Sequence, residues 1–150
     1  MVYPDLAMVV IDDRWVASEG TLDGKPMLVR ARQNLRSLAG HPQLPHRLRI
    51  VWEYELDSDS GMPSSDELGR MRTCEDLLVG AFEQDNHAIL THVLTCDGLR
   101  QWVFFSSDLQ ESAERIKNVL PHDEPYPIEL TAEPDPNWSE YLDTLRTLEP

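Results

Sequence analysis

The strongest constraint on the fold is a nine-residue run, from position 48 to position 56, in which every second residue is large and apolar. Successive side chains of an extended chain point to opposite faces, so these residues share one face. They are Leu48, Ile50, Trp52, Tyr54 and Leu56. The run predicts a β-strand starting at residue 47, with one face that another layer of the fold has to cover.

After this strand the spacing of apolar residues becomes helical. Ser64 and Glu67 have the spacing of a capping box, and apolar residues then recur every three or four positions, which predicts a helix over 64–84. Two runs rich in β-branched and aromatic residues follow at 87–96 and 99–106, separated by an Asp-Gly pair that is typical of a tight hairpin turn.

A second helix and a fourth strand are predicted next. Ser107 and Gln110 form another possible capping box, and a β-prone run occupies 126–133. A closing helix is predicted after Asp135-Pro136, with Trp138 and Tyr141 among its apolar residues. The predicted buried face of the second helix consists of Leu109, Ala113, Ile116 and Leu120.

The element order from residue 47 is therefore strand, helix, strand, strand, helix, strand. This is the βαββαβ unit of ferredoxin-like folds, which places two helices on one face of an antiparallel sheet. The predicted fold class is α+β, with a ferredoxin-like core and a closing helix over 47–147.

An N-terminal extension over 1–46 precedes this core. Its main feature is a predicted β-hairpin within 14–32 that turns at Asp23-Gly24. A short helical turn is expected over 33–38. The length fits one domain over 1–150.

The strand at 99–106 is apolar on both faces. Trp102 and Phe104 point to one face, and Val103 and Phe105 point to the other. One face meets the two helices, and the second face also needs a cover, because a large exposed apolar patch is unusual in a monomer. We expect the N-terminal hairpin and the closing helix to cover it together. A homodimer through this second face is the alternative.

The net charge of −14 is distributed unevenly. Residues 1–49 carry seven basic and five acidic side chains, whereas the remaining 101 residues carry six basic and 22 acidic ones. Such a field repels nucleic-acid phosphates and anionic membranes and attracts basic partners. We therefore expect a basic protein partner, with no nucleic acid and no membrane. Solubility alone is the other explanation of a strongly charged surface.

No catalytic, cofactor-binding or metal-binding set is recognisable. His87 and His92 are predicted to point to opposite faces of one strand, so they cannot chelate a metal together. A calcium loop starting at Asp57 fails, because its twelfth position is Leu68 rather than a glutamate. We expect a protein that is not an enzyme and needs no cofactor.

The sequence also predicts a cytoplasmic location. Cys74 and Cys96 stand alone in apolar segments, as buried thiols do in a reducing compartment. The first residues do not resemble a signal peptide, and no apolar stretch approaches the length of a membrane span.

Several motifs resemble a bacterial family of unknown function, DUF695. They are Gly61-Met62-Pro63-Ser64, Glu75-Asp76-Leu77-Leu78, Trp102-Val103-Phe104-Phe105, Asp135-Pro136-Asn137-Trp138-Ser139-Glu140-Tyr141 and, upstream, Gly24-Lys25-Pro26-Met27-Leu28-Val29-Arg30-Ala31-Arg32. The resemblance covers most of 14–147 and brings no catalytic residues. The family is in turn distantly similar to the ribonuclease E inhibitor protein B, which implies an acidic, non-catalytic regulator that acts by binding protein.

Two sets of candidate contact residues follow. The carboxylates expected to meet a basic protein partner are Asp76, Glu83, Glu111, Glu114, Glu133, Asp135, Glu140 and Asp143. The alternative function is binding of a small anionic ligand by Arg30, Arg32 and Arg36, which Arg47 and Arg49 follow in the chain. The other interpretation of these arginines is that they pair with carboxylates inside the fold.

Overall fold

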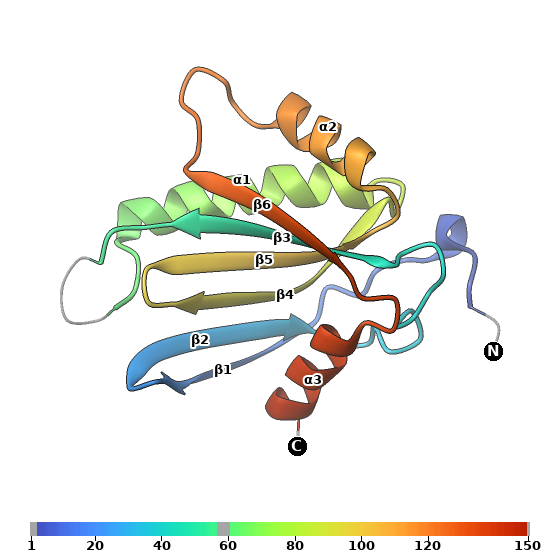
Figure 1. Cartoon of the computed structure of the whole chain (residues 1–150), viewed down its shortest axis with the longest axis horizontal. Coiled ribbons are helices and arrows are strands. Elements are labelled where there is room, and N and C mark those ends of the chain that lie inside the picture. The colour runs from blue at the N-terminus through green and yellow to red at the C-terminus, as the bar shows by residue number, and fades with distance from the viewer. Residues whose placement is uncertain (1–2, 57–60, 150) are drawn as a thin grey trace.

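The computed structural model describes residues 3–56 and 61–149 (Figure 1). Its centre is one antiparallel sheet of six strands in the order β1-β2-β4-β5-β3-β6. The strands are β1 Trp15–Leu22, β2 Lys25–Arg32, β3 His46–Glu53, β4 Ala88–Cys96, β5 Leu99–Ser106 and β6 Ile128–Pro134, and the helices are α1 Ser65–Glu83, α2 Leu109–Val119 and α3 Ser139–Leu148. A short 3-10 turn covers Leu6–Met8. The α+β class and the predicted order of elements are confirmed.

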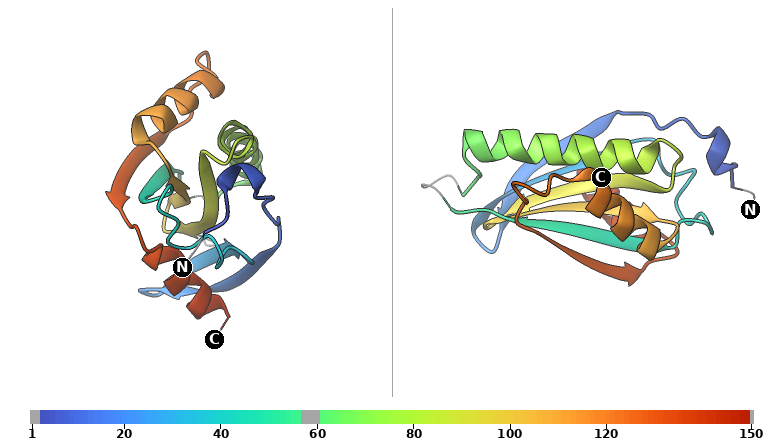
Figure 2. Two further views of the ribbon diagram at one scale, coloured as in Figure 1. Left: turned by 90° about the vertical axis from the view of Figure 1, so that its right-hand side faces the viewer. Right: turned by 90° about the horizontal axis from the view of Figure 1, so that it is seen from above.

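Helices α1 and α2 cover one face of the sheet, as Figure 2 shows in both views. Ser64 caps α1 by accepting a hydrogen bond from the backbone of Glu67, as the capping box predicts. The apolar face of β3 packs here against α1 and the aromatic residues of β5. The buried residues of this layer are Leu48, Ile50, Trp52, Tyr54, Met71, Cys74, Leu78, Phe82, Ala88, Leu90, Val93, Trp102, Phe104 and Ile116.

The N-terminal hairpin forms as predicted, but it lies in a different place. Asp23 and Gly24 take positive φ values at its turn. Strand β2 then pairs with β4, with Val29 opposite Leu94, so the hairpin continues the sheet instead of covering its second face. The prediction of a covering hairpin is therefore wrong. The edge of β4 would otherwise leave a row of backbone groups unpaired, and β2 satisfies them.

The second face is covered by α3 together with the segment that leads from β2 to β3. Trp138 stacks on Phe105 with ring centroids 4.5 Å apart, which confirms the predicted role of the closing helix. Figure 2 shows α3 on the side of the sheet opposite α1 and α2. The buried residues of this layer are Leu6, Ala31, Leu35, Leu38, Leu44, Ile89, Val103, Phe105, Trp138, Tyr141 and Leu145.

Helix α2 packs Leu109, Ile116 and Leu120 against the core as predicted, and it differs from the prediction at its cap and at one buried position. Its cap is Asp108, whose side chain accepts from the backbone of Glu111, rather than Ser107. Ser112 is buried in place of Ala113, which is exposed. The Ser112 hydroxyl lies within hydrogen-bond distance of His87 and Ser106 inside the core, which satisfies this buried polar group.

Three further element ends differ from the prediction. Strand β3 ends at Glu53, so Leu56 is exposed. Residues 33–38 form turns rather than a helix. Helix α3 begins at Ser139, although Asp135 still accepts hydrogen bonds from its first backbone N–H groups.

The start of the rejected calcium loop, residues 57–60, lies outside the described residues. In the described part of the chain, no helix is both long and apolar enough to cross a bilayer.

Candidate functional site

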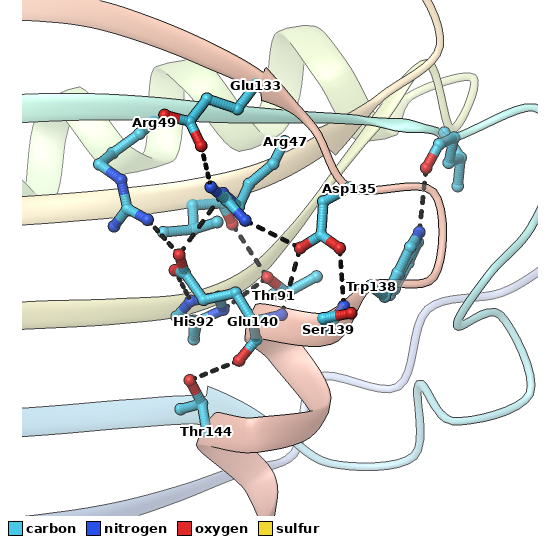
Figure 3. A network of polar contacts seen from close by, with 12 residues as sticks. Arg47, Arg49, Thr91, His92, Glu133, Asp135, Trp138, Ser139, Glu140 and Thr144 are labelled. Carbon is cyan, nitrogen blue, oxygen red and sulfur yellow. Dashed lines mark hydrogen bonds and ion pairs between the residues drawn. The ribbon is translucent and has the colours of Figure 1, made fainter.

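The most extensive polar network lies between the second face of the sheet and the start of α3 (Figure 3). Arg47 and Arg49 reach it from β3, and His92 reaches it from β4. A register shift between Leu90 and His92 places the imidazole opposite Val103, on the second face. The carboxylates come from the end of β6, which carries Glu133, from the segment before α3, which carries Asp135, and from the first turn of α3, which carries Glu140.

Glu140 is at the centre of this network. Its Oε2 lies 2.6 Å from His92 Nε2, and its Oε1 contacts Arg49 and lies 3.4 Å from Arg47 Nε. Arg47 also reaches Glu133 at 2.7 Å and Asp135 at 3.0 Å. The charges alternate, so each cation faces at least one anion within ion-pairing distance.

Both groups of this pair have lowered pKa values, for different physical reasons. Burial lowers the pKa of His92, and the hydrogen bond to Glu140 only partly opposes that effect. Burial by itself raises the pKa of Glu140, but the hydrogen bond from His92 and the nearby Arg49 outweigh it and bring the pKa to about 2. His92 therefore donates from Nε2 to Glu140.

The same geometry restricts what His92 can do chemically. Its side chain is 0% exposed, and its second ring nitrogen, Nδ1, lies 2.7 Å from Thr91 Oγ1. Both nitrogens are thus engaged inside the protein, and a substrate would have no ring nitrogen to meet. The arrangement ties α3 to β3 and β4.

A second histidine lies among hydroxyl groups that sequence reasoning did not bring together. His87 Nε2 is 2.8 Å from Ser112 Oγ, which in turn lies 2.7 Å from Ser106 Oγ, while Nδ1 is 3.0 Å from Ser107 Oγ. Burial lowers the pKa of His87. A Ser–His contact of this length can activate a nucleophile, but Ser106 and Ser112 are fully buried, so no acyl group can reach them. These contacts join α2 to the end of β5 and to the residue before β4.

The arginines predicted to bind an anion do not converge. Arg30 pairs with Glu75 of α1, and Arg32 pairs with Glu83 of the same helix at 2.7 Å. Arg36 lies elsewhere and pairs with Glu149 at 3.3 Å. Arg47 and Arg49 belong to the network around Glu140 (Figure 3). Each of these arginines thus has a carboxylate within ion-pairing distance in the fold.

The structure also separates the predicted partner-binding carboxylates. Glu83 is held under β2 by Arg32, and Asp135 is buried at the start of α3. Glu133 and Glu140 belong to the network already described, and Asp143 pairs with Arg146 on the exposed side of α3. Asp76, Glu111 and Glu114 are exposed on α1 and α2.

A different group of carboxylates gathers where β3 ends and β5 and β6 begin (Figure 1). These exposed side chains, which we call the acidic end, are Glu53, Glu55, Asp66 and Glu129. None of them has an ion pair among the described residues. A hollow of about 390 Å³ lies within this region, lined by Glu53, Tyr54, Glu55, Leu56, Ser64 and Glu67. Sequence reasoning missed the group because its members come from three elements, β3, α1 and β6, and from the connection after β3.

No set of three His, Cys, Asp or Glu side chains in the described residues is arranged to hold a metal ion. No curated protein matches this chain. A model of a family of unknown function, DUF695, matches residues 13–146, which is the family that the turn, cap and aromatic motifs resemble. The chain therefore belongs to the DUF695 family.

Proposed function

We propose that this chain is a non-catalytic interaction domain that binds a basic protein partner at its acidic end. The observation that carries the proposal is a contrast between two kinds of side chain. Most basic side chains have a carboxylate partner in the fold, whereas the carboxylates of the acidic end have no ion pair among the described residues. The basic side chains that lie within 4.0 Å of a carboxylate in the fold are Arg14, Lys25, Arg30, Arg32, Arg36, Arg47, Arg49, Arg70, Arg115 and Arg146. The carboxylates of the acidic end lack such partners and are free to attract cations from another molecule.

Affinity capture from a lysate of the source cells tests this proposal. A captured protein is eluted with salt, identified, purified and titrated calorimetrically at low and moderate salt. The acidic-end variant carries Glu53→Gln, Glu55→Gln and Glu129→Gln. The matched control removes the same number of charges from α1 and α2 through Asp76→Asn, Glu111→Gln and Glu114→Gln.

We expect the acidic-end variant to weaken binding at least tenfold and the control to weaken it by less than about threefold, because only close charges contribute strongly in salt. Equal losses in the two variants would mean that the partner responds to net charge alone, which contradicts docking at the acidic end. A larger loss in the control would support the carboxylates predicted from sequence. The proposal also fails when no salt-eluted partner exists.

One observation favours the alternative function, binding of a small anion. Arg36 keeps 57% of its side chain exposed and lies with Arg14 in a polar hollow of about 570 Å³ near the end of α3. An anion there would compete with Glu149 for Arg36. Thermal unfolding in the presence of phosphate and of citrate tests this function, since a ligand of the native state raises the transition temperature. A transition temperature that neither phosphate nor citrate raises would rule out binding of a small anion at this hollow.

We further propose to class the unit formed by β3 to β6 with α1 and α2 as ferredoxin-like. The strand order β4-β5-β3-β6 and the placement of both helices on one face support this class. The bacterial origin, the cytoplasmic location, a homodimer through the second sheet face, and the distant similarity to the ribonuclease E inhibitor protein B stay predictions from sequence.

A further inference from the structure

Strand β1 is one edge of the sheet, and its register shows which backbone groups point outward. The two-residue turn makes Leu22 and Lys25 a hydrogen-bonded pair, and the backbone N–H of Gln33 donates to Arg14 at 2.8 Å at the other end of the hairpin. Between these two ends of the hairpin, hydrogen-bonded residue pairs alternate with non-hydrogen-bonded pairs. In the non-hydrogen-bonded pairs, the backbone N–H and C=O groups of the β1 residue therefore point away from β2. The residues with outward backbone groups in the middle of the strand are Ala17, Glu19 and Thr21.

The two edges of the sheet differ in how they are protected. Strand β6 lies between Pro127 and Pro134 and carries Glu129 and Glu133, which are features that discourage pairing with another strand. Strand β1 has no proline and no bulge, and its only charged residue is Glu19. An unprotected edge of eight residues is a template for another extended chain.

A cavity of about 330 Å³ opens directly beside this edge, between the hairpin and the end of α3. Its lining residues are Ser18, Glu19, Gly20, Thr21, Met27, Val29, Leu94, Thr144, Thr147 and Leu148. The lining combines the apolar side chains of Met27, Val29, Leu94 and Leu148 with the hydroxyl groups of Ser18, Thr21, Thr144 and Thr147. Gly20 contributes to the space, because a Cβ added to it would meet nothing within 4 Å.

The edge and the cavity together indicate the kind of molecule that fits. Only an extended polypeptide presents backbone N–H and C=O groups at the repeat of a β-strand. A strand added beside β1 directs alternate side chains to the second face of the sheet, where the cavity lies. Glu19 and Asp23 are exposed at this edge and its turn and have no ion pair among the described residues, so basic residues in the added segment would find opposite charges there.

We propose that β1 accepts an extended segment of a partner polypeptide as an additional strand, with one apolar side chain of that segment in the cavity beside Gly20. The contact is made by backbone hydrogen bonds and apolar burial, so it responds weakly to salt. It concerns a surface separate from the acidic end, and its test is independent of the test of the proposed function.

Selection of a phage-displayed library of linear peptides on the immobilised chain tests the proposal. We expect enrichment of peptides in which β-branched or apolar residues alternate with polar ones. Their binding, measured by fluorescence anisotropy, should protect the amide hydrogens of Ala17, Glu19 and Thr21 from exchange.

Two variants address the two halves of the site. Ala17→Pro removes one outward N–H without removing a native ladder bond, and Gly20→Val fills the cavity. Each is expected to weaken peptide binding at least tenfold. Thr131→Val, which places an equivalent side chain on the opposite edge strand β6, is expected to leave binding unchanged. Thermal unfolding checks that each variant folds. If Ala17→Pro does not fold, Gly20→Val still tests the proposal.

Three results would overturn the proposal. The first is a selection with no peptide enriched above background. The second is a set of peptides that bind both variants as tightly as the original chain. The third is concentration-dependent self-association in sedimentation experiments that Ala17→Pro abolishes, because the edge would then belong to a second copy of this chain.

Discussion

Glu140 shows how a single side chain can connect elements that are far apart in the sequence. It faces one histidine and two arginines from two strands, and only 24% of its side chain is exposed. Replacing one member of such a partly buried group leaves the others without their counter-charge, which costs more than the pair contributes when intact.

We expect Glu140→Gln to lower the free energy of unfolding by about 1–3 kcal/mol, because Arg47 and Arg49 lose a shared anion. Urea denaturation measures the change. The control is Asp143→Asn on the same helix, whose ion pair with Arg146 is exposed, and it should change stability by less than about 0.5 kcal/mol. Equal effects of the two variants would show that burial of the network contributes nothing.

The pKa of Glu140 also predicts a pH dependence. Folding lowers it from an ordinary value of 4.5 to about 2, so the unfolded chain binds the proton more tightly than the native chain does. The stabilisation from Glu140 is therefore complete above about pH 4.5 and disappears as the pH falls toward 2. Urea titrations between pH 7 and pH 3 should show the stability difference between the original chain and Glu140→Gln narrowing with acid. A stability difference between the two chains that stays constant with pH would contradict the lowered pKa of Glu140.

At the scale of elements, the closing helix depends on one aromatic anchor. Trp138 precedes α3 with a φ of 58° and is fully buried. It stacks on Phe105, and its indole N–H donates to the carbonyl of Leu44 at 2.9 Å. The unfavourable backbone conformation persists because packing on both sides of the ring determines it.

We expect Trp138→Ala to destabilise the fold by about 3–5 kcal/mol, the usual cost of removing a buried aromatic side chain. Hydrogen exchange should show that the amides of α3 lose more protection than those of α1, because α1 packs on the other face of the sheet. Uniform loss across both helices would mean that α3 does not open separately from the rest of the fold.

For the whole molecule, the net charge of −14 opposes compactness, because unpaired carboxylates repel one another. Screening by salt should therefore raise the urea midpoint as NaCl increases from low to physiological concentration. The triple variant Glu53→Gln, Glu55→Gln and Glu129→Gln is expected to start from a higher midpoint and respond less to salt. A midpoint that falls with salt would show that the internal ion pairs outweigh the surface repulsion.

What the sequence determines by itself is local. Alternation from Leu48 predicts β3, helical spacing after Ser64 predicts α1, and the pairs Asp23-Gly24 and Asp97-Gly98 predict two hairpins. These features depend on residues close together in the chain, whose side-chain directions and turn conformations follow from backbone geometry. The order of the elements followed from them, and so did the need for a cover over the second face.

The tertiary structure alone decides which distant groups meet. Pairing of β2 with β4 depends on an edge that exists only after the sheet has formed, and the network of Arg47, His92 and Glu140 joins positions up to 93 residues apart. The bulge beside Thr91 that turns His92 toward Glu140 leaves no periodic mark in the sequence. The same reason applies to the acidic end and to the cavity beside β1. Strands pair with strands, and cations with anions, across distances in the sequence that local patterns do not show. Which carboxylates and backbone groups remain without a partner is therefore known only after the other groups have paired.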